Sequence, residues 1–298
     1  MRAQLFGLGF LCWAVGCAAP VDDLGQAEEA DGVSLAPPPV KGGYEGNVAT
    51  DLPGQGGAGG EGSSGGLAGA GGEGPGPTPT PKPETGLLAF YDFDAPLGYA
   101  FDLSGNANHG TVQGSGVSIE ASGRVGEGAA FSGGGGSIHV SSSAKLDFTT
   151  AATVEFWIQL SSFGAGTILS RGLGLGDNSV RVRTSQGNLQ VVFSRAGQGS
   201  TILTTDPDLL GSSWKHVAIV NDGLKLSLYV GGTLRTSTQG GYLGSCSAPL
   251  VLGKNDSADT AFSGVLDEVR LWSSARSPAQ VCASAGGTFD SGSSLCVL

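Results

Sequence analysis

Oxygen-bearing side chains alternate along one short stretch of the sequence, FDLSGNANHG at 101–110. Asp102, Ser104, Asn106 and Asn108 fall at every second position, with glycine at 105 and 110. Carboxylate, hydroxyl and amide oxygens are ligands that Ca²⁺ prefers, but the ion takes about six to eight of them. The loop alone supplies too few, so a calcium site needs a carboxylate from elsewhere in the chain. The alternative is a tight turn whose Asp and Asn side chains cap their own backbone.

The same loop does not match the EF-hand pattern of calcium loops. Ala107 stands where that pattern needs glycine, and Gln113 stands where it needs a bidentate glutamate. A second acidic turn, NDSAD at 255–259, is a weaker candidate for a calcium site.

Residues for acid–base or nucleophilic catalysis are not grouped in the sequence. A glycosidase needs two acids that flank one glycosidic bond. Asp267 and Glu268 are adjacent, and adjacent residues of a strand point to opposite faces. The three histidines lie far apart without an H-E-x-x-H pattern, so a zinc site has no local support. The sequence therefore predicts a protein that is not an enzyme.

The first residues have the layout of a secretory signal. Arg2 precedes an apolar run at 5–15 that is too short to span a bilayer. The residues AVGC at 14–17 resemble a bacterial lipobox, so we expect a lipoprotein signal peptide at 1–16 and a lipidated N-terminus at Cys17. Ala18 and Ala19 favour the outer membrane or cell surface as the location. The alternative is cleavage near Ala19 and a free secreted protein.

Residues 17–85 are expected to form a disordered linker. Glycine and proline dominate this acidic stretch, and its large apolar residues are too scattered to build a core. The chain has a net charge of −11 and no basic stripe. Nucleic acid is therefore not an expected partner, and the expected membrane contact is the lipid anchor.

Short alternating segments rich in β-branched and aromatic residues predict an all-β domain over 86–276. In TVEFWIQL at 153–160, the apolar residues 154, 156, 158 and 160 share one face of the expected strand. Glu155, Trp157 and Gln159 share the other face. The pairs at 222–223 (Asp-Gly) and 231–232 (Gly-Gly) predict two hairpin turns and hence a meander of three strands.

Residues 277–298 are expected to form a short helix and a cysteine-containing tail. Ser277 as N-cap and Pro278 at the first helical position favour a helix at 277–285. Exported proteins form disulfides, and Cys282 and Cys296 flank a Gly/Ser-rich stretch that could fold back. They are the preferred pair, with Cys246 either free or a competing partner, because connectivity does not follow from sequence.

Eight segments, in order, resemble the laminin-G-like jelly roll of the concanavalin A-like lectin/glucanase superfamily. They are AFYDFD (89–94), DLSGNANHGT (102–111), GRVGEGAAFSG (123–133), LDFTTAATVEFWIQ (146–159), ILSR (168–171), WKHVAIVNDGLKLSLYVGGTL (214–234), LVLGKN (250–255) and FSGVLDEVRLWSSARS (262–277). The resemblance implies an all-β, two-sheet antiparallel jelly-roll sandwich. It also implies a structural calcium held by an acid that maps onto Asp267, so calcium is expected near Asp102, Asn106 or Asp267.

The resemblance covers glycosidases and lectins, but the E-x-D-x-x-E pattern of its laminarinase-type members does not occur. We therefore expect a surface lipoprotein with a non-catalytic carbohydrate-binding or adhesion module, whose partner is a glycan or a surface protein. The alternative is a protein-interaction or structural component without a sugar site, and a glycoside hydrolase is less favoured. Trp157, Trp214 and Trp272 are expected in the core. Sugar contacts stay unassigned, with loop residues such as Tyr99 and Phe163 as candidates.

Overall fold

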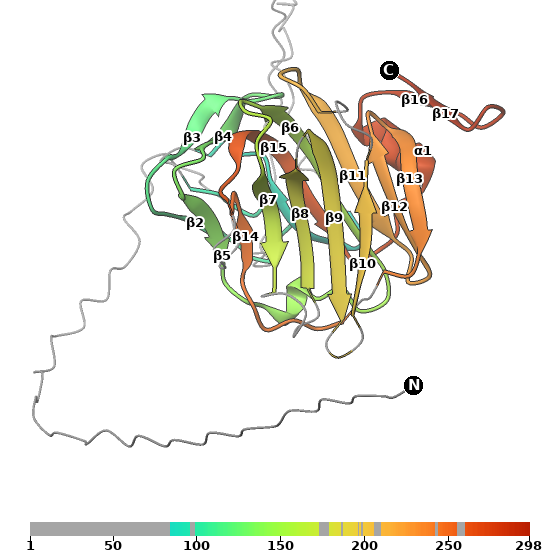
Figure 1. The fold of residues 1–298 in the computed structure, drawn as a ribbon, viewed down its shortest axis with the longest axis horizontal. Coiled ribbons are helices and arrows are strands. Elements are labelled where there is room, and N and C mark those ends of the chain that lie inside the picture. Colours follow the sequence, from blue (N-terminus) through green and yellow to red (C-terminus); the bar gives the residue numbers. More distant parts are fainter. Residues whose placement is uncertain are drawn as a thin grey trace, which may run out of the picture. The chain divides into compact units, whose positions relative to one another are not determined.

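The computed structural model describes residues 84–95, 99–172, 179–185, 187–195, 197, 199–205, 210–241, 244–254 and 260–298. The expected signal peptide, Cys17 and nearly all of the expected linker lie outside these residues, as does the NDSAD turn at 255–259. The described part is all-β, as predicted: two large antiparallel sheets form a sandwich (Figure 1). No helix of the described part is long and apolar enough to cross a bilayer.

The first sheet has eight strands, with β6 and β15 near its middle. The strand β1 (Leu87–Tyr91) pairs with β15 beside the main path. Along that path the order is β13 (Thr233–Gln239), β12 (Lys225–Val230), β11 (Lys215–Asn221), β6 (Ala152–Leu160), β15 (Ser263–Trp272), β4 (Glu127–Ser132) and β3 (Val117–Ser122).

The second sheet has seven strands and lies in front of the first in Figure 1. A single 3₁₀ turn, η1 (Ala144–Leu146), precedes β6. The order in this sheet is β10 (Gly199–Thr204), β9 (Asn188–Arg195), β8 (Ser179–Ser185), β7 (Gly166–Arg171), β14 (Leu250–Leu252), β5 (Ser137–Val140) and β2 (Gly110–Gln113).

The main core lies between the two sheets and follows the period-two pattern of the strands. In β6, Val154, Phe156 and Ile158 are at most 1% exposed and belong to this core. In β9, Val191 and Phe193 belong to the same core from the other sheet. The alternation therefore directs Glu155, Trp157 and Gln159 to the outer face of the first sheet, as the sequence predicted.

The predicted hairpin turns join β11, β12 and β13 into a three-stranded meander. Gly223 has φ 87° in the first turn, and Gly231 and Gly232 have φ 59° and 72° in the second. These left-handed backbone conformations favour glycine, which explains why both turns fall at these positions.

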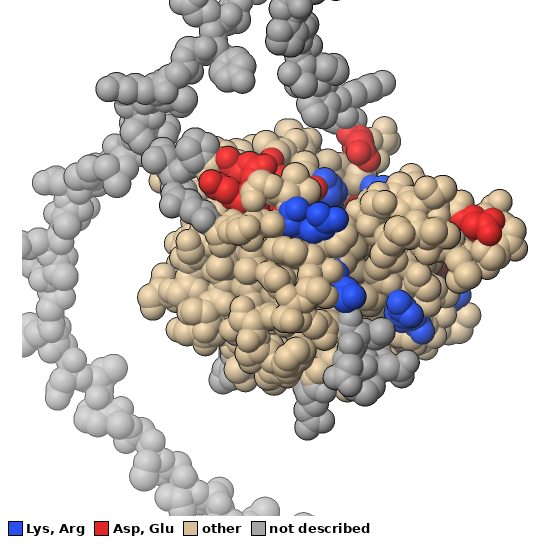
Figure 2. Space-filling view, turned by 90° about the horizontal axis from the view of Figure 1, so that it is seen from above, with Lys and Arg blue, Asp and Glu red and all other residues tan. Residues whose placement is uncertain are grey.

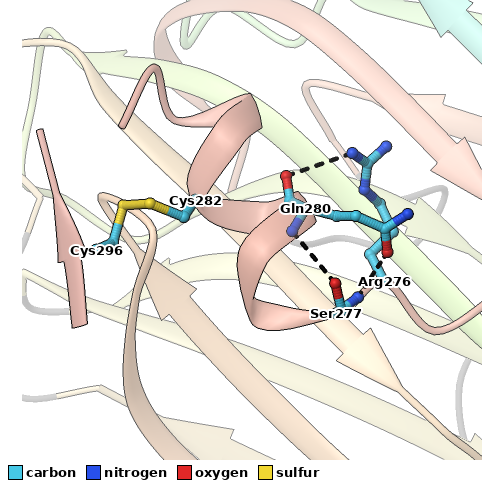
Figure 3. The surroundings of a disulfide bond; sticks show 5 residues. All are labelled: Arg276, Ser277, Gln280, Cys282 and Cys296. Carbon is cyan, nitrogen blue, oxygen red and sulfur yellow. Dashed lines mark hydrogen bonds between the residues drawn. A yellow bond between two sulfur atoms is a disulfide. The ribbon is translucent and has the colours of Figure 1, made fainter. Parts of the chain in front are cut away.

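The C-terminal part begins with the helix α1 (Pro278–Ser284), which is capped as predicted. The Ser277 hydroxyl accepts the N–H of Gln280 at 3.3 Å, and the Gln280 side-chain oxygen accepts the N–H of Ser277 at 2.8 Å (Figure 3). This reciprocal pair satisfies two N–H groups that the first turn of a helix otherwise leaves without partners.

A hairpin of β16 (Thr288–Asp290) and β17 (Leu295–Val297) follows the helix. The predicted disulfide between Cys282 and Cys296 is confirmed, and it ties this hairpin to α1 (Figure 3). Cys246 is a free thiol. We call residues 277–298 the C-terminal cap.

The C-terminal cap packs on the outer face of the first sheet, where it forms a second, smaller core. Val281 of α1 is fully buried against Ala218 and Val220 of β11 and Tyr229 of β12. A sandwich sheet with one free face normally exposes polar residues there. Here part of that face is covered, and charged side chains near the cap are buried with it.

Candidate functional site

The loop at 101–110 is a turn whose side chains form hydrogen bonds with the backbone of β1. The Asp102 carboxylate accepts N–H groups from Phe90, Ser104 and Asn108 at 3.0, 2.9 and 2.8 Å. The side-chain amide of Asn106 donates to the Leu87 carbonyl at 2.9 Å. The alternating polar side chains therefore satisfy backbone groups of the loop and of the neighbouring strand, as in the turn alternative.

The Asp267 carboxylate is engaged elsewhere. It accepts the N–H groups of Arg124, Val125 and Glu268 at 2.7, 2.9 and 2.7 Å, so it holds the turn between β3 and β4. Glu268 has φ 53°, and the register of β15 shifts between Asp267 and Arg270. This bulge turns Arg270 toward the outer face, opposite Glu155 of β6.

These residues, as placed, do not fit a calcium ion. Asp102 and Asp267 contact different segments, and each already accepts three N–H groups. Within the described part of the chain, no three His, Cys, Asp or Glu residues lie close enough together to hold a metal. The binding of calcium itself stays an untested prediction.

Two neighbouring pockets on the outer face of the first sheet share one indole, that of Trp157. The first, the Trp214 pocket, has a volume of about 570 Å³, and the second, the Arg270 pocket, about 460 Å³. We call the two together the Trp157 site. Residues that line the Trp214 pocket include Trp157, Trp214, Lys215, His216, Arg235 and Leu298. Those of the Arg270 pocket include Arg124, Trp157, Glu268, Arg270, Trp272 and Arg276.

The Trp157 indole is held between two other side chains. The guanidinium carbon of Arg124 lies 4.6 Å from the ring centroid, within reach of a cation–π interaction. The His216 ring, from the paired position on β11, meets the indole edge-on at 5.5 Å. These contacts limit the orientations that are open to the indole.

A fully buried carboxylate, that of Glu155, lies beneath the C-terminal cap. Its Oε1 accepts the Trp272 indole N–H at 3.0 Å and the Ser284 hydroxyl at 3.3 Å. The Arg276 guanidinium lies 3.4 Å from the same oxygen. Burial raises the pKa of the Glu155 carboxyl, and the nearby Arg276 charge opposes that rise. This network joins the middle of the first sheet to the cap.

His216 is also buried next to this carboxylate, with its Nε2 3.7 Å from Glu155 Oε2. Burial, together with the nearby charges of Arg270 and Arg276, lowers the pKa of His216 to about 3. The ring is therefore neutral at pH 7, and it supports the Trp157 indole as an uncharged group.

The tryptophans correct one sequence prediction, because Trp157, Trp214 and Trp272 do not belong to the core between the sheets. Trp157 and Trp214 are only partly buried and line the Trp214 pocket. Trp272 is buried, but on the outer face, where it donates to Glu155. Sequence reasoning also missed Glu155 as a buried group, although the alternation of 153–160 placed it on the correct face.

The chain belongs to the concanavalin A-like lectin/glucanases superfamily. A laminin-G-type family model with that description matches residues 132–282, which is half of the chain. This agrees with the two-sheet sandwich and with the resemblance seen in the sequence. No curated protein matches the sequence.

Several solved structures share the fold. Domain 4 of AbnA, a GH43 extracellular arabinanase from Geobacillus stearothermophilus, was solved in complex with arabinotriose. It is 21% identical, with a TM-score of 0.54, and the match covers 67% of this chain and 98% of that one.

Two toxin structures are similar in the same way. The binding domain of Paraclostridial Mosquitocidal Protein 1 is 16% identical, with a TM-score of 0.56. The receptor binding domain of botulinum neurotoxin D is 16% identical, with a TM-score of 0.54. Each match covers 67% of this chain and 52% of the other, so this chain spans about half the length of these toxin structures.

Proposed function

We propose that this protein is a non-catalytic carbohydrate-binding module and that the Trp157 site is its binding surface. One observation carries the proposal: a partly buried indole, held by Arg124 and His216, lines two adjoining pockets with hydrogen-bonding groups around it. Sugar sites combine an aromatic surface for the apolar face of a ring with a few polar groups that fix its orientation.

The fold of the structural neighbours supports this proposal but does not decide it. Domain 4 of AbnA was solved with arabinotriose, and the two toxin structures are named as binding domains. The same fold serves different functions, so the argument for this chain rests on its own pockets. The rival function is a protein-interaction or structural role on the cell surface without a sugar site.

We propose binding without hydrolysis because the carboxylates near the Trp157 site are not placed to act together on one glycosidic bond. Glycoside hydrolysis uses two carboxylates that both reach one glycosidic bond. Glu155 is 0% exposed and lines neither pocket. Glu268 and Glu84 line the Arg270 pocket, but each lies beside an arginine: Glu268 is paired with Arg270, and Glu84 lies 3.8 Å from Arg276.

Replacement of Trp157 by alanine is expected to weaken the binding of a recognised sugar by about tenfold or more, because truncation of a contact tryptophan costs about 1.4 kcal/mol or more. The affinity is measured by titration calorimetry. The control is Tyr99→Ala, which removes an aromatic ring that is 49% exposed in a loop and lines neither pocket. Equal affinity in wild type and Trp157→Ala, or a loss in Tyr99→Ala alone, would contradict the proposal that the binding site lies on the outer face of the first sheet.

We also propose that the module is anchored by a lipid at Cys17, at the outer membrane or the cell surface. The AVGC sequence at 14–17 supports this proposal, and secretion without a lipid is the alternative. In cells that process lipoproteins, the mature protein is expected to carry the mass of a lipid and to lose it in Cys17→Ala. A lipid mass that persists in Cys17→Ala would contradict the anchor.

A further inference from the structure

Basic side chains are concentrated around the Trp157 site although the whole chain is acidic. The chain has a net charge of −11. Among the described residues, the acidic side chains that line the two pockets are Glu84 and Glu268. The basic side chains that line them are Arg124, Lys215, Arg235, Arg270 and Arg276. Figure 2 shows one face of the molecule on which charged side chains are few: one group of basic side chains lies beside acidic ones, and other basic side chains lie apart from them.

Two of these cations are neutralised by the protein itself. Arg270 is paired with Glu268. Arg276 lies 3.4 Å from Glu155 and 3.8 Å from Glu84. The two guanidinium groups also lie over aromatic rings, Arg270 over Phe90 and Arg276 over Trp272. They are part of the framework of the site and leave little positive charge for a ligand.

The other three cations lack a carboxylate partner in the described part of the chain. Among the described residues, no carboxylate lies within ion-pair distance of Arg124, Lys215 or Arg235. Lys215 and Arg235 line the Trp214 pocket and Arg124 lines the Arg270 pocket. The positive charge that remains for a ligand is therefore distributed on both sides of the Trp157 indole.

Arg124 is positioned without being neutralised. Asp267 accepts the backbone N–H groups of Arg124 and Val125, which fixes the turn. The Trp157 indole then supports the guanidinium at 4.6 Å. A planar guanidinium held in this way can form two parallel hydrogen bonds to a carboxylate or a sulfate.

We infer that the ligand of the Trp157 site is an anionic oligosaccharide, with a carboxylate or sulfate group bound by Arg124 and a sugar ring against Trp157. This inference rests on the proposed function, because it specifies the class of sugar bound at the same site. Uronic acids carry a carboxylate and sulfated sugars carry a sulfate, and an arginine can bind either anion. Separate probes are therefore needed to distinguish these two classes of sugar.

The test is titration calorimetry of the purified full-length protein with three probes of matched backbone. They are neutral galactotetraose, tetragalacturonate and a sulfated galactan tetrasaccharide. At least one anionic probe is expected to bind about tenfold more tightly than the neutral one, since a charge-assisted hydrogen bond is worth about 1.5 kcal/mol or more. Its affinity is expected to fall as salt is raised from low to physiological concentration.

Arg124→Gln is expected to reduce the affinity for the anionic probe about tenfold and to weaken binding of the neutral probe by a smaller factor, because Arg124 also supports the Trp157 indole. The matched control is Arg183→Gln on β8 of the second sheet, where the side chain donates to Gln190 at 2.7 Å. Thermal melts of both variants establish that they are folded. Unchanged anionic affinity in folded Arg124→Gln would overturn the assignment of this residue.

Different results would overturn the anionic ligand and the carbohydrate-binding function. Tighter binding of the neutral probe than of both anionic probes would overturn the anionic ligand and leave the carbohydrate-binding proposal in place. No binding of any sugar, charged or neutral, by folded wild-type protein would overturn both.

Discussion

Replacement of Glu155 by alanine is expected to lower the free energy of unfolding by about 3 kcal/mol. Removal of one partner from a buried ion pair leaves the other partner with an uncompensated charge or an unpaired donor. Here Arg276 loses its 3.4 Å carboxylate contact, and the Trp272 indole N–H loses its acceptor. The measurement is urea unfolding at pH 7, followed by tryptophan fluorescence.

The control for this variant is Glu127→Ala, because Glu127 is exposed on β4. We expect a change within about 0.5 kcal/mol for that variant, as for most surface substitutions. Equal losses in Glu155→Ala and Glu127→Ala would contradict the account of the buried network. Such a result would mean that the contacts of Glu155 with the C-terminal cap contribute little to the free energy of unfolding.

Removal of the disulfide by the double substitution Cys282→Ala and Cys296→Ala is expected to cost up to about 3 kcal/mol. The bond closes a loop with a sequence separation of 14, and a loop of that length restricts the unfolded chain by about this amount. Loss of the bond also frees β17, whose Cys296 lines the Trp214 pocket. We therefore expect sugar binding to weaken together with stability.

This prediction is measured by urea unfolding of the double variant and by unfolding of the wild type with and without a reductant. The matched control is Cys246→Ala, which removes a free thiol and is expected to change neither stability nor binding beyond small packing effects. A wild type with the same unfolding midpoint under oxidising and reducing conditions would contradict a stabilising role for the bond.

Local features of the chain could be predicted because they depend on neighbouring residues. The alternation in β6 depends only on the period of a strand, so the faces of Val154 and Trp157 followed directly. The turn at Gly223 needs a positive φ that glycine supplies at little cost. The capping box of α1 lies within four residues, and the disulfide joins cysteines that are close in sequence.

The burial of Glu155 could not be predicted, because its cover comes from distant parts of the chain. Trp272 and Arg276 lie more than 100 residues away in sequence, and Ser284 belongs to a cap that the strand pattern does not include. Trp157 and Trp214 were expected in the core because they lie in predicted strands, at positions that the family resemblance covers. The structure puts them on a partly covered outer face.

The spacing of oxygen atoms at 101–110 was ambiguous for a physical reason. A calcium ion and a set of backbone N–H groups both attract carboxylate and amide oxygens. Whether the Asp102 carboxylate binds a calcium ion or accepts backbone N–H groups depends on whether another strand presents its N–H groups to the loop. Phe90 of β1 does so at 3.0 Å, and that pairing is a property of the fold.

The central claim is that the Trp157 site binds carbohydrate, and a glycan-array screen tests it most directly. Wild-type protein and Trp157→Ala are screened side by side on neutral and anionic glycans, and melting curves show that both are folded. We expect the wild type to bind a related set of sugars, and we expect these signals to be lost or strongly reduced in Trp157→Ala. A blank array with folded wild-type protein, or the same set of signals from both proteins, would contradict it.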